Sequence, residues 1–390
     1  MKTLKIQEVA NQVRGVSYKP DDLHDSLNDS SVILLRANNI DDGKINFDDV
    51  VYVDKSKVSK EQYLKRGDIL VCASSGSKQL VGKAASVDFE TECTFGAFCK
   101  VVRPQEEFAR YLGKYFQSNT YRSKISAVAI GANINNIRNE HIDTLDLRVY
   151  DEAKNEEIVH VISCVQSIIE HRKQEIKKLD ELIKARFVEM FGDPVNNEKG
   201  WITDTVDNLC IEIYGGGTPS KVHPEYYEDG DIPWVSSKDM KTDILTDSQI
   251  KINQMGVENS TARMVPVNSV IMVIRSGILK HTLPVAINAV PITVNQDLKV
   301  FIPSERILTR FLAVQFKMHE KDILTGVRAV TADNIEFNSL KQRKLIVPSI
   351  ELQQEYVLFL EQVDKSKVAV QKALDETQIL FDSLMQKYFG

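Results

Sequence analysis

The stretch IVHVISCVQSIIEHRKQEIKKLDELI, residues 158–183, decides the fold, because its apolar residues recur at alternating intervals of four and three. This spacing is the heptad pattern of helices that wind around each other. The seam positions in this stretch are Ile158, Ile162, Val165, Ile169, Arg172, Ile176, Leu179 and Ile183. We therefore predict a long helix over residues 151–192 that needs a partner along this seam.

The same spacing returns 198 residues later, in the segment 351–390. Its seam positions are Tyr356, Leu360, Val363, Lys367, Val370, Leu374, Thr377 and Phe381. Polar residues interrupt both seams, and such interruptions are one way to fix how two helices pair. Each helix, at roughly 38 residues, would be about 57 Å long. We predict that the two helices pair as an antiparallel intramolecular coiled coil; the alternative is two unrelated helices packed on separate cores.

Each helix closes one copy of a repeated module. With a shift of 200 residues the opening segments align: Ile6, Val9, Val13 and Gly15 fall on Val206, Leu209, Ile213 and Gly215. The correspondence continues through 31–45 with 231–245, 64–76 with 265–277, and 131–149 with 328–347. The segment RFVEMFG, ending at Gly192, likewise matches SLMQKYFG, ending at Gly390. The chain thus consists of two copies of one module.

The longer part of each copy mixes strand and helix patterns. Short apolar runs such as residues 68–72 and 97–102 are typical of strands. Residues 107–126 and 306–324 are typical of helices. We therefore expect an α+β fold with two related α/β domains, residues 1–150 and 193–350, joined by the two long helices at 151–192 and 351–390.

Composition excludes several classes of protein. The 390 residues suffice for two or more domains. No run of 18 or more apolar residues occurs and the N-terminus lacks the apolar core of a signal peptide, so we expect a cytoplasmic protein without a membrane partner. The net charge of −6 argues against an indiscriminate nucleic-acid binder, which usually carries a basic excess. Five scattered cysteines without CxxC spacing, and histidines without HExxH spacing, predict neither a disulfide framework nor a metal site.

The glycine-rich stretch YGGGTPSK, residues 214–221, is not a nucleotide site by its spacing. A P-loop requires a glycine, four residues and then Gly-Lys-Ser/Thr, and a dinucleotide fingerprint requires G-x-G-x-x-G before a helix. The segment from Gly76 to Ala84 also fails, because five residues separate its glycines and no hydroxyl follows Lys83. We interpret Gly215–Gly217 as a turn in which glycine permits positive φ.

Two related domains on a helical spacer would contact an extended ligand at two points. Duplex DNA is an extended ligand with a fixed repeat of about 34 Å per turn, so a spacer of defined length selects which two sites are bound together. Relative to their length, the helical segments carry the greater share of the net negative charge, and they have mixed charge. They therefore suit a scaffold for partner subunits better than a surface for phosphates.

The segments GGGTPSK, YYEDGDIPWVSSKDM (226–240) and LDELIKARFVEMFGDP (179–194) closely resemble the specificity (S) subunits of Type I restriction-modification enzymes. The resemblance covers the whole chain, since that family consists of two target recognition domains alternating with two helical spacer regions. The first copy departs from the motif, because Gly15-Val16-Ser17-Tyr18 has a single glycine and VILLRANNI replaces IPWVSSKDM. Such a departure is expected if each domain recognises a different sequence.

The resemblance implies a non-catalytic subunit that binds double-stranded DNA and recruits two methyltransferase (M) subunits and, in the restriction form, restriction (R) subunits. The complete enzyme would then be an adenine-N6 DNA methyltransferase and ATP-dependent endonuclease, which flips the adenine out of the duplex. S-adenosylmethionine, ATP and Mg are expected on the partner subunits and no cofactor on this chain. In agreement, the sequence has no Asn/Asp-Pro-Pro-Tyr/Phe motif and no Walker motif.

Polar loops that follow strands are the candidate DNA contacts, because Arg, Lys, Asn, Gln, Ser and Thr supply the hydrogen bonds that distinguish bases. In the first copy they are Ser74, Ser75, Ser77, Lys78, Gln79 and Lys83, and in the second Arg275, Ser276, Lys280, His281 and Thr282. A further set in the second copy comprises Thr218, Ser220, Lys221, Ser236, Ser237 and Lys238. Asn133, Asn135 and Asn136 are either base readers or turn formers. Trp234 lies in an apolar run, so we assign it to the core rather than to base stacking.

Three other functions stay open at this point. Within the same class, the chain fits the recognition subunit of a two-chain Type II system or an orphan specificity subunit. From a different class, it fits a coiled-coil protein scaffold, although a scaffold does not require two large domains rich in polar loops. The third, a nucleotide-dependent enzyme acting through Gly215–Gly217, lacks the required spacing.

Overall fold

A computed structural model describes residues 1–77, 79–128, 135–326, 328–329 and 333–390. Lys78 and Asn133, two of the residues singled out from the sequence, lie outside this part of the chain. The chain divides into two compact units. Unit 1 comprises Met1–Gln174 with Gln371–Gly390, and unit 2 comprises Glu175–Val370. Each unit therefore contains one predicted globular domain together with a portion of both long helices.

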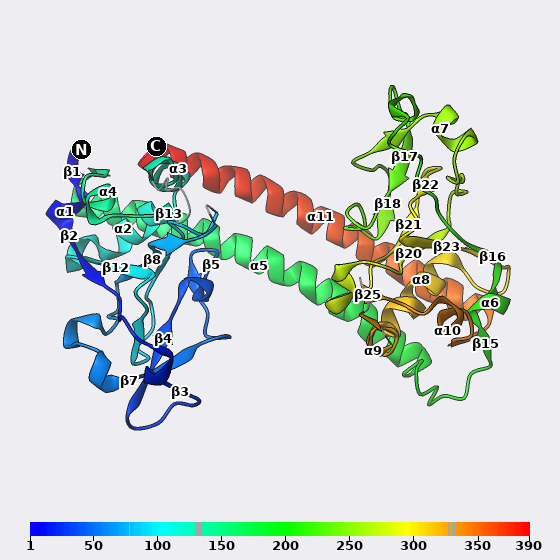
Figure 1. The fold of residues 1–390 in the computed structure, drawn as a ribbon, viewed down its shortest axis with the longest axis horizontal. Coiled ribbons are helices and arrows are strands. Elements are labelled where there is room, and N and C mark those ends of the chain that lie inside the picture. Colours follow the sequence, from blue (N-terminus) through cyan, green and yellow to red (C-terminus); the bar gives the residue numbers. More distant parts are fainter. Residues whose placement is uncertain (78, 129–134, 327, 330–332) are drawn as a thin grey trace. The chain divides into compact units, whose positions relative to one another are not determined.

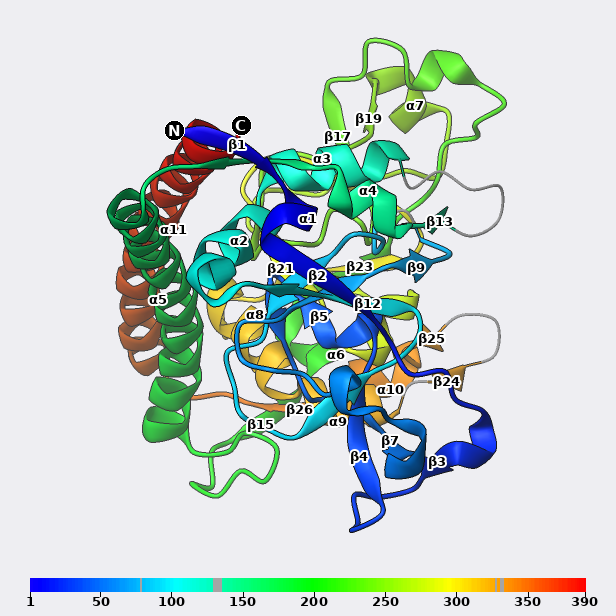
Figure 2. The ribbon, with the colours of Figure 1, turned by 90° about the vertical axis from the view of Figure 1, so that its left-hand side faces the viewer.

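Unit 1 is built on two four-stranded sheets (Figures 1 and 2). One has the order β10-β8-β12-β2 and is antiparallel, and the other has the order β11-β4-β7-β3, with β11 parallel to β4. Its elements are β1 (Lys2–Lys5), α1 (Ile6–Val9), β2 (Ala10–Arg14), β3 (Leu23–His24), β4 (Ser31–Leu35), β5 (Ile40–Asp41), β6 (Lys44–Ile45), β7 (Val51–Asp54), β8 (Ile69–Cys72), β9 (Ser74–Ser75), β10 (Ala84–Ser86), β11 (Cys93–Phe95), β12 (Cys99–Pro104), α2 (Ala109–Phe116), α3 (Asn119–Val128), β13 (Asn135–Asn136), α4 (Asn139–Asp143) and β14 (Asp146–Val149).

Unit 2 contains a five-stranded sheet of order β16-β23-β20-β21-β18 and a three-stranded sheet of order β19-β17-β22. Its elements are β15 (Thr203–Thr205), α6 (Val206–Leu209), β16 (Cys210–Gly215), β17 (Ile232–Val235), β18 (Ile244–Leu245), β19 (Lys251–Ile252), α7 (Gln254–Glu258), β20 (Val270–Val273), the 3-10 helix η7 (Gly277–Lys280), β21 (Val285–Asn288), β22 (Thr293–Val294), β23 (Leu298–Pro303), α8 (Thr309–Met318), α9 (Glu320–Thr325), β24 (Arg328–Ala329), β25 (Asp333–Asn334), α10 (Phe337–Lys341) and β26 (Lys344–Ile346).

The two units repeat one topology, as the sequence predicted. The order β10-β8-β12-β2 in unit 1 corresponds to β21-β20-β23-β16 in unit 2, and the parallel pair of β4 and β11 corresponds to that of β17 and β22. The strand pair that closes each domain is also equivalent, β1 with β14 and β15 with β26. The predicted α+β fold with two related domains is therefore confirmed.

The central strands form because their side chains are buried on both faces. All four residues of β8 (Ile69–Cys72) and all four of β20 (Val270–Val273) are buried. A continuous apolar run, rather than an alternating one, is the pattern of a strand covered on both sides. In unit 1, Ile69 and Val71 pack with helices α1 and α2, whereas Leu70 and Cys72 pack with Leu35 and Phe95 of the second sheet.

The two predicted domain helices are each broken in two. Residues 107–126 form α2 and α3, and residues 306–324 form α8 and α9. In unit 1 the break has a local cause, because the Ser118 hydroxyl accepts a hydrogen bond from the Tyr121 N–H at 3.1 Å and so caps the start of α3. Periodicity alone does not reveal this break, since α2 and α3 share one buried face that includes Tyr111, Tyr115 and Tyr121.

The long helices are α5 (Glu152–Phe191) and α11 (Ile350–Phe389), each of 40 residues. In unit 1 the start of α5, at Ile158 and Ile162, packs in one cluster with Met385 and Phe389 at the end of α11. In unit 2 the two helices exchange these places, because Phe187 near the end of α5 packs with Tyr356 and Leu360 near the start of α11. Each unit thus contains the start of one helix against the end of the other, as an antiparallel pair requires. A continuous coiled-coil seam stays a prediction.

Every apolar seam position is withdrawn from solvent to some degree. The buried positions are Ile158, Ile162, Val165, Ile169, Tyr356, Leu360, Val363 and Val370, and the half-buried ones are Ile176, Leu179, Ile183, Leu374 and Phe381. The polar seam residue Lys367 forms an ion pair with Asp180 at 2.6 Å in unit 2. Despite their length, α5 and α11 are too polar to be membrane spans, and within the described ranges no other helix qualifies either.

Unit 2 contains a buried histidine that makes its stability depend on pH. His319, between α8 and α9, is 2 % exposed, and within the described part of the chain neither ring nitrogen has a hydrogen-bond partner. Burial, and to a lesser degree the nearby Arg343 guanidinium, lower the pKa of His319 from 6.5 to about 4, against smaller opposing effects of Asp322 and Asp193. The folded protein therefore binds this proton less readily than the unfolded chain does.

We expect the free energy of unfolding of unit 2 to fall as the pH falls below 6.5, because only the unfolded state gains a proton there. The His319 contribution amounts to about 2 kcal/mol between pH 7 and pH 5. Urea unfolding of the parent and of His319→Leu, followed by fluorescence, measures it, since both tryptophans, Trp201 and Trp234, lie in unit 2. As the pH falls, the free energy of unfolding of the variant should rise relative to that of the parent. If the two free energies change with pH in parallel, His319 is not the source of the pH dependence.

Candidate nucleic-acid interface

Two of the three glycines at residues 215–217, Gly216 and Gly217, lie against the backbone of other segments of unit 2. A Cβ on Gly216 would lie 2.6 Å from the Asn295 carbonyl oxygen and closer still to that of Val294, and one on Gly217 would overlap Thr261. None of Gly215–Gly217 has positive φ. The sequence interpretation was therefore right to make this stretch structural but wrong about the reason, which is close backbone approach rather than a left-handed conformation.

The first unit has the same close approach with one glycine. A Cβ on Gly15 would lie 2.9 Å from the Phe95 carbonyl oxygen and closer to that of Gly96. The Val16 N–H donates to the Phe95 oxygen at 2.8 Å, as the Gly217 N–H donates to the Val294 oxygen at 3.1 Å. Gly15 is thus the structural equivalent of Gly216, one residue from the position that the sequence alignment gave.

Trp234 holds the glycine stretch from the other side. Its side chain is 7 % exposed and packs in a small cluster with Ile252 and Ala262, which confirms that it belongs to the core. The indole Nε1–H donates to the Gly217 carbonyl oxygen at 3.0 Å. Tyr227 supports the same stretch, because its hydroxyl donates to the Pro219 oxygen at 2.6 Å. The backbone of residues 217–219 is therefore fixed, and the polar residues Thr218, Ser220 and Lys221 are presented on the surface.

In unit 1 the predicted loop 74–83 starts as a short strand. Ser74 and Ser75 form β9, which pairs with Asn135 and Asn136 of β13, so the structure brings two of the predicted polar segments together. Helix α3 holds the far end of the loop, because the Arg122 guanidinium donates to the carbonyl oxygens of Val81 at 2.6 Å and Gln79 at 2.9 Å. Ser77 and Gln79 are exposed between these two fixed ends.

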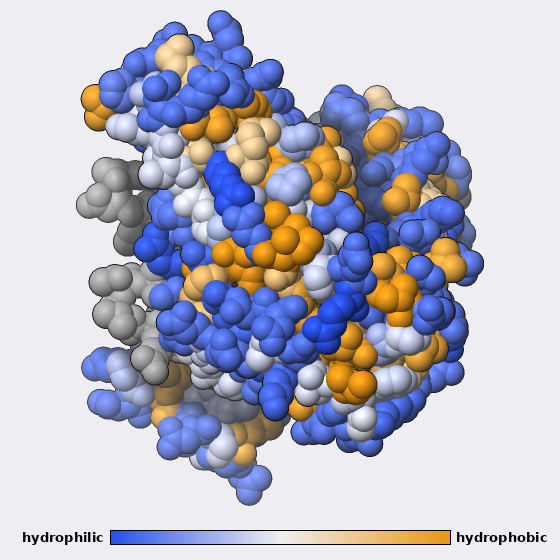
Figure 3. All heavy atoms as spheres, turned by 90° about the vertical axis from the view of Figure 1, so that its right-hand side faces the viewer, coloured by the Kyte–Doolittle hydropathy of each residue, from blue (hydrophilic) through white to orange (hydrophobic). Residues whose placement is uncertain are grey.

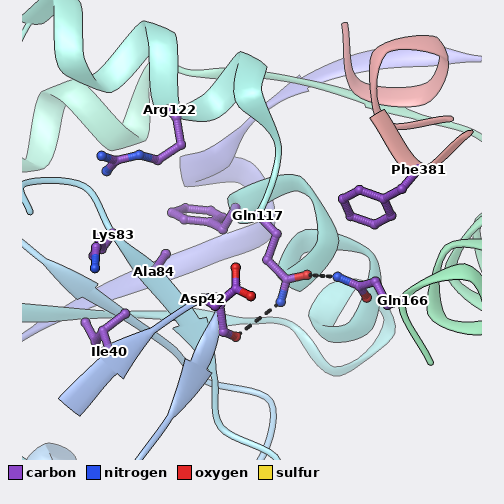
Figure 4. Close-up of a pocket in the computed structure, with 10 residues that line it drawn as sticks. Ile40, Asp42, Lys83, Ala84, Gln117, Arg122, Gln166 and Phe381 are labelled. Atoms are coloured by element: carbon purple, nitrogen blue, oxygen red, sulfur yellow. Dashed lines mark hydrogen bonds between the residues drawn. The ribbon is translucent and has the colours of Figure 1, made fainter. Parts of the chain in front are cut away.

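Lys83, by contrast, lies in a pocket of unit 1 rather than on the outer part of the loop. The pocket has a volume of about 240 Å³, with Lys83 and Arg122 near one another and Gln117 and Gln166 on another side (Figure 4). Gln166 Nε2 donates to Gln117 Oε1 at 2.8 Å, and Gln117 Nε2 donates to the Gly43 oxygen at 3.3 Å. Lys83 is half-buried, and its Nζ lies 4.0 Å from Asp41 Oδ1.

The equivalent loop of unit 2 is fixed at both ends as well. Arg275 pairs with Asn334 through an isolated antiparallel bridge, in the place of the β9–β13 pairing. Ser276 caps η7 by accepting a hydrogen bond from the Ile278 N–H. At the far end, Glu320 of α9 accepts from the Thr282 hydroxyl at 3.0 Å and from the Leu283 N–H at 2.6 Å. Lys280 and His281 are exposed on the intervening turn.

The remaining predicted set, residues 236–238, forms a turn after β17. The Ser236 hydroxyl donates to Asp239 Oδ2 at 2.7 Å, which closes the turn and occupies this side chain. Ser237 is half-buried and Lys238 is exposed. Ser236 follows Val235, whose carbonyl oxygen accepts from the Asn295 N–H at 2.9 Å, so this turn lies next to residues 295–297.

The turn Asn295-Gln296-Asp297 joins these segments, and sequence reasoning missed it. Gln296 bonds with the Thr218 hydroxyl through its side-chain oxygen. Asp297 Oδ1 accepts a hydrogen bond from Arg275 Nε at 2.7 Å and forms an ion pair with the same guanidinium, 2.6 Å from Nη2. Asn295, 7 % exposed, donates from Nδ2 to Asp297 Oδ2 at 3.2 Å. The available signal was three adjacent polar residues directly after the apolar run Pro291–Val294.

The candidate site is rich in hydrogen-bonding groups. Hydroxyls, amides and cations at these turns suit contacts to base edges and phosphates, whereas the carboxylates Asp239, Asp297 and Glu320 accept hydrogen bonds from residues of the turns themselves. All five cysteines are free, and in the residues that the structure describes no group of three or more His, Cys, Asp and Glu side chains could hold a metal ion.

Comparison with known proteins shows what this chain is similar to. Residues 198–377 match the family model of the Type I restriction modification DNA specificity domain. The chain is 34 % identical over 194 residues to the specificity subunit of the Type I restriction enzyme EcoKI from Escherichia coli, a match that covers 50 % of this chain and 42 % of that subunit. It is 33 % identical over 183 residues to the StySPI specificity subunit from Salmonella potsdam, covering 47 % of this chain and 40 % of that one. The matched region thus spans less than half of these relatives.

A solved structure extends the similarity to the full length of the chain. The crystal structure of the S subunit of a Type I restriction-modification system from M. genitalium superposes with a TM-score of 0.55 at 13 % sequence identity, covering 100 % of this chain and 96 % of that one. At this identity the likeness establishes the fold alone. Residues 198–377 are therefore similar to the Type I restriction modification DNA specificity domain, and the whole chain shares its fold with a solved specificity subunit.

Proposed function

We propose that this chain is the DNA sequence-recognition subunit of a Type I restriction-modification complex, and that it recognises a target in two separated halves. The observation that carries the proposal is the repeated fold with exposed polar loops at equivalent places in both units. In each copy a loop after the central strand meets a second polar segment, β9 with β13 in unit 1 and Arg275 with Asn334 in unit 2. Equivalent frameworks with different side chains suit two different half-sites of duplex DNA.

The catalytic steps belong, in this proposal, to partner subunits. Two methyltransferase subunits would bind this chain and methylate an adenine in each half of the target with S-adenosylmethionine. Restriction subunits, which would require ATP and Mg, would join the same assembly. The chain itself would act as a non-catalytic subunit in the cytoplasm, where its DNA substrate and these cofactors are found.

The surface offers apolar as well as polar area for protein partners. On the face shown in Figure 3, hydrophobic side chains form several patches among hydrophilic ones. Exposed apolar side chains of unit 2 include Ile202, Ile211 and Val222, which are 75 %, 73 % and 84 % exposed. Exposed apolar patches rimmed by polar residues are typical of protein–protein interfaces, which supports a subunit that works in an assembly.

Sequencing of methylated bases in cells with and without this gene tests the proposal. We expect a split motif, with methylated adenine in both halves, that disappears when the gene is deleted and returns with a plasmid copy. Methylation without cleavage of unmodified DNA would indicate an orphan specificity subunit. An unchanged pattern of methylation, in cells that express the partner subunits, would contradict the proposed function.

A further inference from the structure

The two units share one backbone framework around the central strand but carry different side chains at one pair of equivalent positions on it. In unit 1 the N–H groups of Ala73 and Ser74 donate to the Phe98 oxygen at 2.9 and 3.0 Å. In unit 2 those of Ile274 and Arg275 donate to the Asp297 oxygen at 2.9 and 3.3 Å. Arg275 is therefore the structural equivalent of Ser74, and Asp297 that of Phe98.

The opposing segment confirms this equivalence. The Ile137 N–H donates to the Ala73 oxygen at 2.8 Å, and the Ile335 N–H donates to the Ile274 oxygen at 2.9 Å. Asn136 and Asn334, which precede these isoleucines, consequently occupy equivalent positions and are both exposed. Ser74 pairs with Asn136 across the strands as Arg275 does with Asn334. The asparagine is common to the two units, whereas the pair 74/98 differs from the pair 275/297 in both members.

In unit 2 the differing pair forms an oriented guanidinium group. Arg275 directs Nε and Nη2 to the same carboxylate oxygen of Asp297, at 2.7 and 2.6 Å, so one edge of the guanidinium is occupied. Asp297 is itself fixed, because Asn295 donates to its second oxygen and accepts from its N–H at 3.1 Å. The opposite edge of the guanidinium, formed by Nη1 and the second hydrogen of Nη2, takes no part in this pair, and the Arg275 side chain is 48 % exposed.

We propose that Arg275, oriented by Asp297, recognises a guanine in the half-site bound by the second domain. Guanine presents O6 and N7 side by side in the major groove, and the fork of an arginine fits them with two parallel hydrogen bonds. Asp297 is then a positioning residue, since it fixes the guanidinium plane without touching DNA. Ser74 and the 69 % exposed Phe98 provide no such fork, so the first half-site has no guanine recognised at the equivalent position. This inference rests on the proposed function and adds to it the identity of one recognised base.

A merely structural role for the pair is the competing explanation. Ion pairs between exposed side chains contribute only about 0–1 kcal/mol to stability, so the loss of this pair should leave the fold intact. Unit 2 also supplies a matched control. Arg306 and Asp204 form another ion pair with similar side-chain exposure, 51 % and 21 % against 48 % and 24 % for Arg275 and Asp297. Arg306 lies on the segment before α8, away from the polar loops.

The experiment compares methylated motifs in cells that carry the complete complex with the parent chain, Arg275→Ala, Asp297→Asn or Arg306→Ala. With the parent we expect a guanine at one position of one half-site. Arg275→Ala should make that single position degenerate, with discrimination against the other bases reduced about tenfold or more. Asp297→Asn should weaken the preference without changing the preferred base, and Arg306→Ala should leave the motif unchanged.

Three results would overturn the inference. If Arg275→Ala methylates the parent motif with unchanged stringency, Arg275 recognises no base. If it methylates nothing, the purified complex is tested for binding to four duplexes that differ only at this position, and equal loss of affinity for all four assigns Arg275 to phosphate contact or folding. If the parent complex prefers the duplex with guanine and the Arg275→Ala complex binds all four duplexes equally, the inference is supported. If the parent itself gives no split motif, the proposed function fails, and this inference fails with it.

Discussion

Replacing Phe389 with alanine is expected to lower the free energy of unfolding of unit 1 by about 4 kcal/mol. Phe389 lies at the end of α11 and is 4 % exposed. Its ring centroid is 5.1 Å from that of Tyr111 and 6.0 Å from that of Tyr115, so its removal leaves a cavity beside two aromatic rings of α2. A cavity among large rigid side chains closes poorly, and for this reason the cost lies well above that of lost apolar burial alone.

Hydrogen exchange measured by mass spectrometry locates this effect. Amides of α2 and β1 should lose protection in Phe389→Ala, whereas the fluorescence-detected unfolding of unit 2, which contains both tryptophans, should not change. Leu380→Ala is the matched control, because Leu380 is 50 % exposed on the same helix within unit 1 and its truncation should cost less than about 0.5 kcal/mol. Unchanged protection of unit 1 in Phe389→Ala would show that the end of α11 does not support this core.

The same aromatic contact closes both units. Phe191, at the end of α5, lies 5.1 Å from Phe311 of α8 in unit 2, as Phe389 lies 5.1 Å from Tyr111 of α2 in unit 1. The last 20 residues of the chain therefore complete the core of the unit that contains its first residues. A stability effect in the N-terminal domain can thus arise from a substitution at the C-terminus.

The repeat and the long helices could be predicted from the sequence because both are patterns within a segment. Heptad spacing marks positions of α5 and α11 that become buried or half-buried, and fully apolar runs mark β8 and β20. The break between α2 and α3 was missed, because a serine cap is a local hydrogen bond that hydrophobic spacing does not contain. Heptad spacing also does not predict which domain core each helix end completes, since the contacting residues Tyr111 and Phe389 are far apart in the chain.

The candidate site was predicted only in part for a similar reason. The polar loops after β8 and β20 follow directly from the sequence, since strands end where apolar runs end. Arg275 was among the predicted contacts, but its partner Asp297 comes from the turn before another strand and was not. Lys83 was predicted as a contact because it is charged and follows a strand, yet the fold places it half-buried in a pocket. The sequence shows which loops are polar. Contacts between turns that are distant in the chain decide which of their side chains are held in a fixed orientation.

Gly216→Ala is expected to destabilise unit 2 by about 3 kcal/mol or more, because the added methyl group would overlap backbone atoms that cannot move aside. Those atoms belong to Val294 and Asn295 at the end of β22, which pairs in parallel with β17. Thr293 and Val294 are completely buried, so the strand has no free volume into which it can shift. Gly277→Ala is the control, since a Cβ there meets no atom within 4 Å and Gly277 has no positive φ. It should change stability by less than about 1 kcal/mol.

Urea unfolding followed by tryptophan fluorescence measures both variants, and Trp234 is a direct reporter because its indole donates to Gly217. Equal urea midpoints for Gly216→Ala and the parent would contradict the close approach described for this turn. The expected consequence extends beyond stability. Asn295 follows the strand that the methyl group would displace, and it fixes Asp297, which in turn orients Arg275. A complex that survives with Gly216→Ala should therefore lose discrimination in the second half-site while it keeps the first, since unit 1 has its own glycine contact at Gly15.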